Sequence, residues 1–359
     1  MAEIRQVSKG VIDMSRVSIV IPIFNMERYL ETCLLSVMDQ SFSDFEVICV
    51  DDLSKDRSRE IVQDLIRMDP RIRLICMQEN RGMGEVRNVG LAEARSNYVA
   101  FFDSDDYLDI DMLQLLHAGT EEETFDIVIC GYRTVDDEGR VLEQYEPRKR
   151  KIIDAHEVKD RLLLANPSVW NKLWRRSLFL DNGILFPTRV LTSYHDDLAT
   201  TPRLIMKAKS INFIDRICYN YLNRPGSDSS VVTDGHLMDF FRIFDLLKDF
   251  LVTEGIYVEE KHNLERLVRI NFGWYAKRSA SAEGVRQYAK FCALMAGGYI
   301  SFDDRLHDMD TAELIQQIPT IGTRPALQSA GAIARFRNFV SRLGGARDPA
   351  RLVGVKGRG

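Results

Sequence analysis

The chain has 359 residues, of which 45% are hydrophobic and 28% are charged, and its formal net charge is −5. At roughly 150 residues per domain this length predicts about two domains, and the ordinary apolar fraction excludes a wholly disordered chain. No apolar run approaches the roughly 20 residues that span a bilayer, and residues 1–10 lack the apolar core of a secretory signal. The six cysteines are widely spaced without a CxxC pair, which excludes zinc-ligand spacing and predicts reduced thiols in the cytoplasm.

The charge is distributed unevenly along the chain. From Arg324 onward there are eight basic residues and one acidic residue, a net charge of +7, so residues 1–323 carry −12. An acidic body is poorly suited to general nucleic-acid binding, so we expect no nucleic-acid partner. It is compatible with a site in which carboxylates hold a metal ion.

The first part of the chain alternates short apolar runs with segments of helical periodicity. The predicted strands are 17–24, 46–50, 72–77 and 98–102, and the predicted helices are 30–38, 56–68 and 83–95. This alternation implies right-handed crossovers and a mostly parallel, doubly wound α/β sheet. Ligands bind beyond the carboxyl ends of such strands. Three polar clusters fall at these ends: Phe24-Asn25, Asp51-Asp52 and Asp103 to Asp106.

The pattern changes further along the chain. We expect a strand over 126–132, a hairpin turn at 136–139, helices over 170–179 and 197–208, and a strand over 211–221. From about residue 235 the periodicity is helical, with predicted helices at 236–254, 257–282, 284–300, 310–318 and 325–343. The glycine-rich segment 344–359 is expected to be a flexible basic tail.

The segment Asp103-Ser104-Asp105-Asp106 carries the strongest local signal for chemistry. Three carboxylates within four residues repel one another unless a cation or hydrogen-bond donors compensate them. Mg²⁺ or Mn²⁺ meets that need, because these ions prefer oxygen ligands and substrate phosphates complete their shell. The alternative is a solvated acidic turn in which Asp side chains cap a helix. The same alternative applies to Asp51-Asp52, which precede Ser54.

Four segments together resemble glycosyltransferases of family 2, which have the GT-A nucleotide-sugar-binding fold. They are VSIVIPIFN, SFSDFEVICVDDLSKD, ENRGMGEVRNVGLAEA and YVAFFDSDDYL, in matching order and spacing across residues 17–110. A weaker similarity to acceptor-side elements of bacterial polysaccharide members continues through VWNKLWRRSLF, FPTRVLTSYHDDL and YNYLNRPGSDSS. The resemblance implies a GT-A domain (16–232) with donor (16–110) and acceptor (111–232) halves. It does not extend further: residues 1–15 are left as an N-terminal extension, and periodicity and composition alone predict the helical C-terminal region (233–343) and the basic tail (344–359).

The resemblance also implies an activity. Such an enzyme would transfer a hexosyl or N-acetylhexosaminyl group, with inversion and with Mn²⁺ or Mg²⁺, from a nucleotide-diphosphate donor. A UDP-sugar is the favoured donor, and the acceptor would be a glycan or lipid-linked glycan in polysaccharide or lipopolysaccharide synthesis. The chain lacks the Gln-x-x-Arg-Trp motif and the flanking membrane helices of the processive synthases, so we expect non-processive transfer.

Site residues follow from the resemblance position by position. The positions expected to bind the donor are Pro22, Phe24, Asn25, Asp51, Asp52, Arg87, Asp103, Asp105, Lys172 and Arg224. Among them, Asp52 and Arg87 match positions near the base, and Asp105 would lie near the ribose. Asp106, together with Asp105, is expected to hold the metal.

The general base is expected in an acid pair that precedes a helix. Family members usually have Glu-Asp there, and this chain has Asp196-Asp197. We choose Asp197 and keep Asp196 as the alternative base. The structural alternative is that both residues merely cap the helix at 197–208.

Three other function classes share single features with this sequence. A haloacid-dehalogenase-type phosphatase has Asp-x-Asp after an apolar strand, but it requires Thr or Val where this chain has Tyr107. A sugar-1-phosphate nucleotidyltransferase needs a glycine-rich loop where this chain has PIFNMERYL. A non-catalytic nucleotide-sugar-binding scaffold would not need the complete set of acids.

An apolar stripe with flanking arginines falls in the C-terminal region, at Ile333, Phe336, Phe339, Val340 and Leu343. It is compatible with peripheral contact to the anionic inner face of the plasma membrane. It is equally compatible with packing on the protein body or in a homo-oligomer interface.

Overall fold

The computed structural model describes residues 16–148, 150–158, 160–163, 166–189, 192, 194–224 and 234–278. The chain divides into two compact units whose segments interleave along the sequence. The first unit contains the chain up to Ala155, Val169–Phe186 and Lys207–Leu222, and the second contains His156–Ser168, Pro187–Met206 and the chain from Asn223. The extension 1–15, the helices expected beyond 282, the apolar stripe and the basic tail lie outside the described residues.

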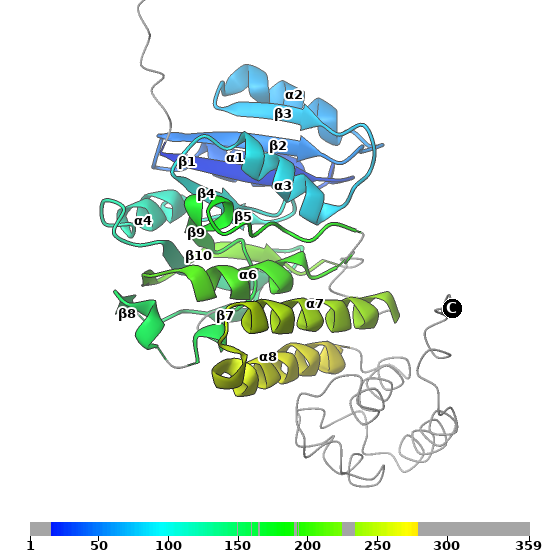
Figure 1. The fold of residues 1–359 in the computed structure, drawn as a ribbon. Helices are drawn as coiled ribbons and strands as arrows, with labels where there is room; N and C mark the ends of the chain where they lie inside the picture. Colours follow the sequence, from blue (N-terminus) through cyan, green and yellow to red (C-terminus); the bar gives the residue numbers. More distant parts are fainter. Residues whose placement is uncertain are drawn as a thin grey trace, which may run out of the picture. The chain divides into compact units, whose positions relative to one another are not determined.

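The first unit is built on a mixed sheet of ten strands, counted within the described residues (Figure 1). Eight strands follow the order β3-β2-β1-β4-β9-β6-β10-β5, while β7 pairs with β6 and β8 pairs with β10. Their bounds are β1 Val17–Ile23, β2 Phe45–Asp51, β3 Ile72–Cys76, β4 Tyr98–Phe101, β5 Tyr107–Leu108, β6 Ile127–Val135, β7 Val141–Tyr145, β8 Arg150–Ile152, β9 Lys172–Arg175 and β10 Ile211–Leu222.

Strand direction determines where a ligand site can form. The pairs β1–β2, β2–β3, β1–β4 and β6–β10 are parallel, whereas β9 is antiparallel to both of its neighbours, β4 and β6. Strands β1 to β4, β6 and β10 therefore run the same way and end at one edge of the sheet. The prediction of a mostly parallel, doubly wound α/β sheet is confirmed.

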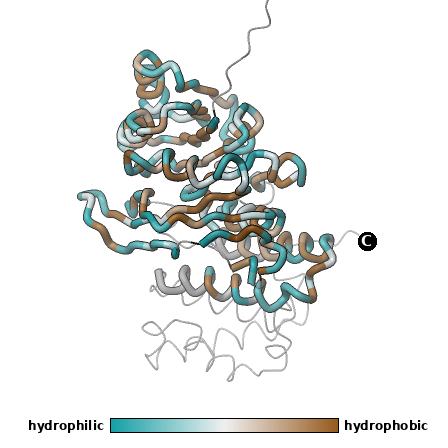
Figure 2. The backbone as a smooth tube through the Cα atoms, turned by 90° about the vertical axis from the view of Figure 1, so that its left-hand side faces the viewer, coloured by the Kyte–Doolittle hydropathy of each residue, from teal (hydrophilic) through white to brown (hydrophobic). Residues whose placement is uncertain are grey.

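Helices cover both faces of this sheet. Helices α1 (Leu30–Met38), α2 (Ser58–Met68) and α4 (Met112–Ala118) share one hydrophobic core with the strands. Helices α3 (Met83–Glu93) and α5 (Ser177–Leu180) pack on the other face, where the rings of Phe179 and Phe101 are 5.6 Å apart. All seven residues of β1 are buried, as expected for a strand covered on both sides. Figure 2 shows brown, hydrophobic stretches of chain alternating with teal, hydrophilic ones.

Helix α3 approaches β1 at a position where only glycine fits. A Cβ atom added at Gly90 would lie 2.2 Å from Cγ1 of Val20. Residue 90 is therefore glycine because the helix lies directly on the strand. This close packing fixes the height of α3 above the carboxyl edge of β1.

The predicted helix over 170–179 is wrong in its first part. Residues Lys172–Arg175 form β9, which fills the gap between β4 and β6, and only Ser177–Leu180 are helical. Residues four apart, such as Trp170 and Trp174, share a face in a helix and also in a strand, so their spacing does not distinguish the two. Pairing with two neighbouring strands decides the outcome.

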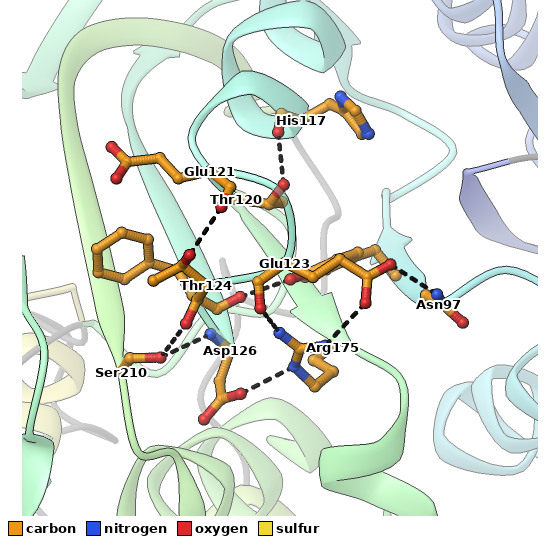
Figure 3. Close-up of polar contacts among 11 residues, drawn as sticks. Asn97, His117, Thr120, Glu121, Glu123, Thr124, Asp126, Arg175 and Ser210 are labelled. Atoms are coloured by element: carbon orange, nitrogen blue, oxygen red, sulfur yellow. Dashed lines mark hydrogen bonds and ion pairs between the residues drawn. The ribbon is translucent and has the colours of Figure 1, made fainter.

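A dense polar network closes the end of the sheet where β6 begins, opposite the carboxyl edge (Figure 3). Arg175 donates from Nε to Asp126 at 2.8 Å and contacts Glu123, which accepts a 2.7 Å bond from Asn97. Ser210 donates to the carbonyl oxygen of Thr124. The network ties α4, β9 and the start of β10 to β6 and has a structural role.

The second unit contains the short helix η2 (Arg161–Leu163), α6 (Asp196–Lys207), α7 (Asp234–Thr253) and α8 (Tyr257–Arg278). Buried leucine and phenylalanine side chains lie between α7 and α8, which agrees with the helical periodicity after residue 235. The buried Arg161 donates to the carbonyl oxygens of Ile205 and Met206 and so caps the last turn of α6. Among the described helices, none combines the length and apolar character needed to cross a bilayer.

Candidate functional site

Two loops at the carboxyl edge of the sheet are locked together by reciprocal hydrogen bonds. In the loop after β1, Asn25 has φ 55° and its backbone N donates to Ser54 Oγ at 3.0 Å. In the loop after β2, the backbone N of Lys55 donates to Asn25 Oδ1 at 2.9 Å. Phe24, beside this junction, is 40% exposed although it is a large apolar residue. The loops therefore hold an exposed ring in a rigid frame.

Asp51 ends β2 and is fully buried, with no solvent-exposed surface. Its carboxylate accepts hydrogen bonds from the backbone N of Ser54 and, at 2.5 Å, from Nε of Arg59. The hydrogen bond to Asp51 raises the pKa of Arg59 above its usual value. Leu53, between these groups, has φ 66°, so the loop is held in a backbone conformation that side chains disfavour. These hydrogen bonds indicate that Asp51 stabilises the loop.

Asp52 fixes a third loop, the one before α3. Its two carboxylate oxygens accept from the backbone N of Arg81 at 2.7 Å and of Gly82 at 2.8 Å. Its carbonyl oxygen accepts from Asn80 Nδ2 at 2.9 Å. The carboxylate is thus held at the start of α3, where the helix dipole favours a negative charge.

Arg87 and Asp103, both predicted as site residues, form an ion pair. The distance from Arg87 Nη2 to Asp103 Oδ1 is 2.6 Å, and Arg87 is buried. The guanidinium also lies over the ring of Phe186, at 5.6 Å from its centre. The structure therefore brings the third helix and the acidic segment after β4 together at the carboxyl edge.

Asp106 is buried, whereas Asp103 and Asp105, the other two acids of the acidic segment, are partly exposed. Its Oδ2 accepts from the hydroxyl of Tyr219 at 2.6 Å, and its Oδ1 accepts from the backbone N of Leu222 at 2.7 Å. Burial and then the charges of Asp105 and Asp103 raise the pKa of Asp106 well above its usual value. The Tyr219 and Leu222 bonds act in the opposite direction.

The acidic segment suits a divalent cation in its chemistry, because burial and then the neighbouring charges of Asp105 and Asp103 disfavour the ionised form of Asp106, and an ion would offset both. Asp105 is partly exposed, whereas the carboxylate of Asp106 already accepts two hydrogen bonds. Within the described residues no three carboxylate, histidine or cysteine side chains converge on one point as a finished metal site. In the described part of the chain, the three carboxylates of the acidic segment are therefore neighbours in sequence without forming a complete metal site.

Lys172, another predicted donor-binding residue, is fully buried in β9. Its Nζ donates to Asn171 Oδ1 at 2.7 Å, and Asn171 in turn donates to the carbonyl oxygen of Cys130 at 2.7 Å. The lysine is enclosed in the sheet, between the strands that lead to the edge.

The remaining predicted residues belong to the second unit. Helix α6 begins at Asp196, so the carboxylates of Asp196 and Asp197 lie in its first turn, and Asp197 Oδ1 accepts from the backbone N of Leu198 at 2.7 Å. His195, just before them, has φ 59° and its ring is 4.5 Å from that of Phe240 in α7. Arg224 also lies in this unit.

Sequence reasoning missed two groups that the structure places at the edge. Arg59 lies eight residues after Asp51, and that spacing carries no recognisable motif. Tyr219 bonds to Asp106 from β10, more than a hundred residues away in the chain. Both partners depend on the tertiary fold.

Comparisons with known proteins find similarity to glycosyltransferases. Residues 18–183 match the family model described as "Glycosyl transferase family 2". The uncharacterized glycosyltransferase EpsJ of Bacillus subtilis is 32% identical over 216 residues, covering 59% of this chain and 62% of EpsJ. The putative glycosyltransferase EpsH of the same organism is 33% identical, covering 57% and 60%. The chain thus matches about 60% of the length of these relatives.

Solved structures of TarS have a fold similar to that of this chain. The crystal structure of Staphylococcus aureus TarS has a TM-score of 0.63 at 22% identity and covers 91% of this chain and 55% of that chain. The 1–349 part of TarS in complex with UDP-GlcNAc has a TM-score of 0.57 at 23% identity, with 92% of each chain covered.

Proposed function

We propose that the chain is a family 2 glycosyltransferase of the GT-A fold that transfers a sugar from a nucleotide-diphosphate donor. The match of residues 18–183 to that family's model and the fold similarity to TarS support this proposal. The donor is a UDP-sugar, and the acceptor is a glycan or a lipid-linked glycan in polysaccharide or lipopolysaccharide synthesis. The complexes of TarS with UDP and UDP-GlcNAc support the choice of nucleotide. Names of relatives that act on polymers, such as a poly(ribitol-phosphate) beta-glucosyltransferase, support the choice of acceptor class.

One observation carries this proposal: the carboxyl edge unites three interlocked loops with the Arg87–Asp103 pair and the acidic segment. A nucleotide needs an aromatic or apolar contact for its base and hydrogen-bond partners for its ribose. Phe24 and Asn25 provide the first contact, and Asp52, Arg87 and Asp103 fix the frame around it. Pro22, buried at the end of β1, shapes the start of the loop.

We propose that Asp105 and Asp106 hold Mn²⁺ or Mg²⁺ next to the donor diphosphate. When bound, the ion stabilises the charge that develops on the leaving diphosphate. Arg224 and Lys172 are the proposed basic contributors on the donor side, Lys172 from within β9. The residues of the protein itself orient the donor and exclude water.

Transfer with inversion requires one base. The acceptor hydroxyl oxygen forms a bond to the anomeric carbon while the bond from that carbon to the diphosphate oxygen breaks. The hydroxyl proton passes to a carboxylate, for which we propose Asp197, with Asp196 as the alternative. Both acids begin α6, and the rigid entry at His195 keeps them in place.

A thermal-shift screen of nucleotide sugars in the presence of Mn²⁺ tests the proposal. A ligand that binds only the folded state raises the melting temperature. We expect UDP-sugars to raise it and GDP- and CMP-sugars to leave it unchanged. If no nucleotide sugar raised it, the proposed function would be wrong.

The main competing function is a nucleotide-sugar-binding scaffold without activity, which shares the whole donor site. Release of UDP from the donor in the presence of acceptor distinguishes the two functions. The phosphatase alternative is set aside, because the segment that contains FFDSDD falls inside the glycosyl transferase family match.

A further inference from the structure

Five aromatic rings form a continuous stack in the first unit. The ring of Trp170 stacks on Tyr219, with centres 4.5 Å apart and planes at 14°, and on Tyr221, at 5.6 Å and 17°. Tyr132 meets Trp170 edge-on at 4.8 Å, and Tyr145 lies 5.7 Å from Tyr132. The stack starts at the fully buried Tyr219 and ends at Tyr145, which is 43% exposed.

The buried end of the stack contacts the acidic segment. The hydroxyl of Tyr219 donates to Asp106, and the residue after Tyr221 donates its backbone N to the same carboxylate. The stack therefore begins at the place where the donor diphosphate is proposed to bind. Tyr132, Tyr145 and Tyr221, the three members nearest the surface, are called the tyrosine ledge below.

The hairpin of β6 and β7 carries two of these tyrosines, and its tip reaches the nucleoside side of the site. Arg28, after β1, is 3.4 Å from Asp137 in the hairpin turn. The ledge thus lies on the hairpin and on β10. The hairpin contacts Arg28, close to Phe24 and Asn25 in the chain, and β10 contacts the acidic segment through Tyr219.

Polar side chains accompany the rings on the same hairpin face. Tyr132 pairs with Tyr145, and Thr134 pairs with Glu143 two residues further on, so all four share one face of the hairpin. Every residue of β7 is exposed, although the strand contains Val141, Leu142 and Tyr145. An exposed aromatic ring beside a carboxylate and a hydroxyl offers a ligand both an apolar face and hydrogen-bonding groups.

A pyranose ring matches this combination. Its axial C–H groups form an apolar face that packs on an aromatic ring, and its hydroxyls form a polar rim. Sites for small polar ligands combine aromatic contact with a few fixed hydrogen-bonding groups in the same way. A purely apolar partner would leave the carboxylate of Glu143 without compensation.

We propose that the tyrosine ledge is a stacking site for a sugar ring of the acceptor and that Glu143 accepts hydrogen bonds from its hydroxyls. This inference rests on the proposed function, because the ledge gains its role from a donor at the acidic segment. In this proposal the tyrosine ledge and Glu143 are the residues that contact the acceptor.

Saturation-transfer NMR with methyl β-D-glucopyranoside and methyl N-acetyl-β-D-glucosaminide as probes tests the ledge. We compare the full chain with Tyr145→Ala, Tyr145→Phe and Leu142→Ala. Leu142 is the matched control, since it is 49% exposed on the same strand but alternates to the other face. Because the ring and not the hydroxyl makes the stack, we expect about a tenfold weaker Kd for Tyr145→Ala only.

The outcomes separate the ledge from the proposed function. If neither glycoside receives saturation from the unmodified chain, or if Tyr145→Ala binds as well as Leu142→Ala, the ledge proposal is overturned. A dimer that Tyr145→Ala dissociates would assign the surface to self-association and would also overturn it. UDP binding with Mn²⁺, measured on the same samples, reports on the proposed function alone and is expected to be equal in all four proteins.

Discussion

Nε of Arg59 lies 2.5 Å from the carboxylate of Asp51, so a partly exposed cation on α2 compensates a fully buried anion at the end of β2. This ion pair supports the loop that carries Asp52 and Ser54. The frame of the nucleoside side therefore depends on a residue outside the recognised motifs.

Removing the cation leaves the Asp51 charge buried without its partner. We expect Arg59→Ala to lower the free energy of unfolding by about 2–4 kcal/mol, because breaking a buried pair strands one ion. The matched control is Arg57→Ala at the residue immediately before the same helix, whose pair with Glu60 is largely exposed, and it should cost less than about 1 kcal/mol. Urea unfolding measures both, and equal losses would contradict the role given to Arg59.

Much of the fold follows from the sequence, because the buried runs ending at Ile23, Asp51 and Phe101 are strands of clear length and composition. The shared edge of Asp51, Asp52 and Asp103 follows from strand direction. The sequence does not show which of its distant segments pair with each other. Two features depend on contacts between segments far apart in the chain. One is the Tyr219–Asp106 hydrogen bond, and the other is the formation of a central strand by Lys172–Arg175.

Gly90 offers a test of how closely α3 lies on the sheet. Alanine at this position would place its Cβ 2.2 Å from Val20, and we expect Gly90→Ala to cost about 1–3 kcal/mol despite the better helix propensity of alanine. Shortening the opposing side chain should relieve the clash. In the Val20→Ala background the cost of Gly90→Ala should therefore shrink, and a double-mutant cycle that shows no coupling would refute the contact.

The acid pair at the start of α6 contains the two candidate bases, and substituting each in turn distinguishes them. We expect Asp197→Asn to lower kcat by about 10²- to 10⁴-fold, the range that a general base supplies, while the Kd of UDP stays the same. Asp196→Asn should have a smaller effect on kcat. The reverse order would identify Asp196 as the base, and near-normal turnover of both variants would exclude the pair.

We expect the basic C-terminal region to bind anionic membranes. Residues from Arg324 onward carry +7, and each basic residue near an anionic surface contributes about 1 kcal/mol of attraction. We expect the full chain to pellet with phosphatidylserine vesicles more than a chain ending at Thr323. The difference should vanish in high salt. Equal pelleting of the two chains would argue against a membrane role for this region.

In the proposed function, the acidic segment after β4 binds the diphosphate of a UDP-sugar through a divalent cation. Calorimetric titration of UDP with and without Mn²⁺ tests it most directly, on the unmodified chain, on Asp105→Ala and on Asp64→Ala as an exposed acidic control on α2. We expect Mn²⁺-dependent binding of UDP that is lost in Asp105→Ala and retained in Asp64→Ala. Binding of UDP that is independent of Mn²⁺ and unchanged in Asp105→Ala would contradict it.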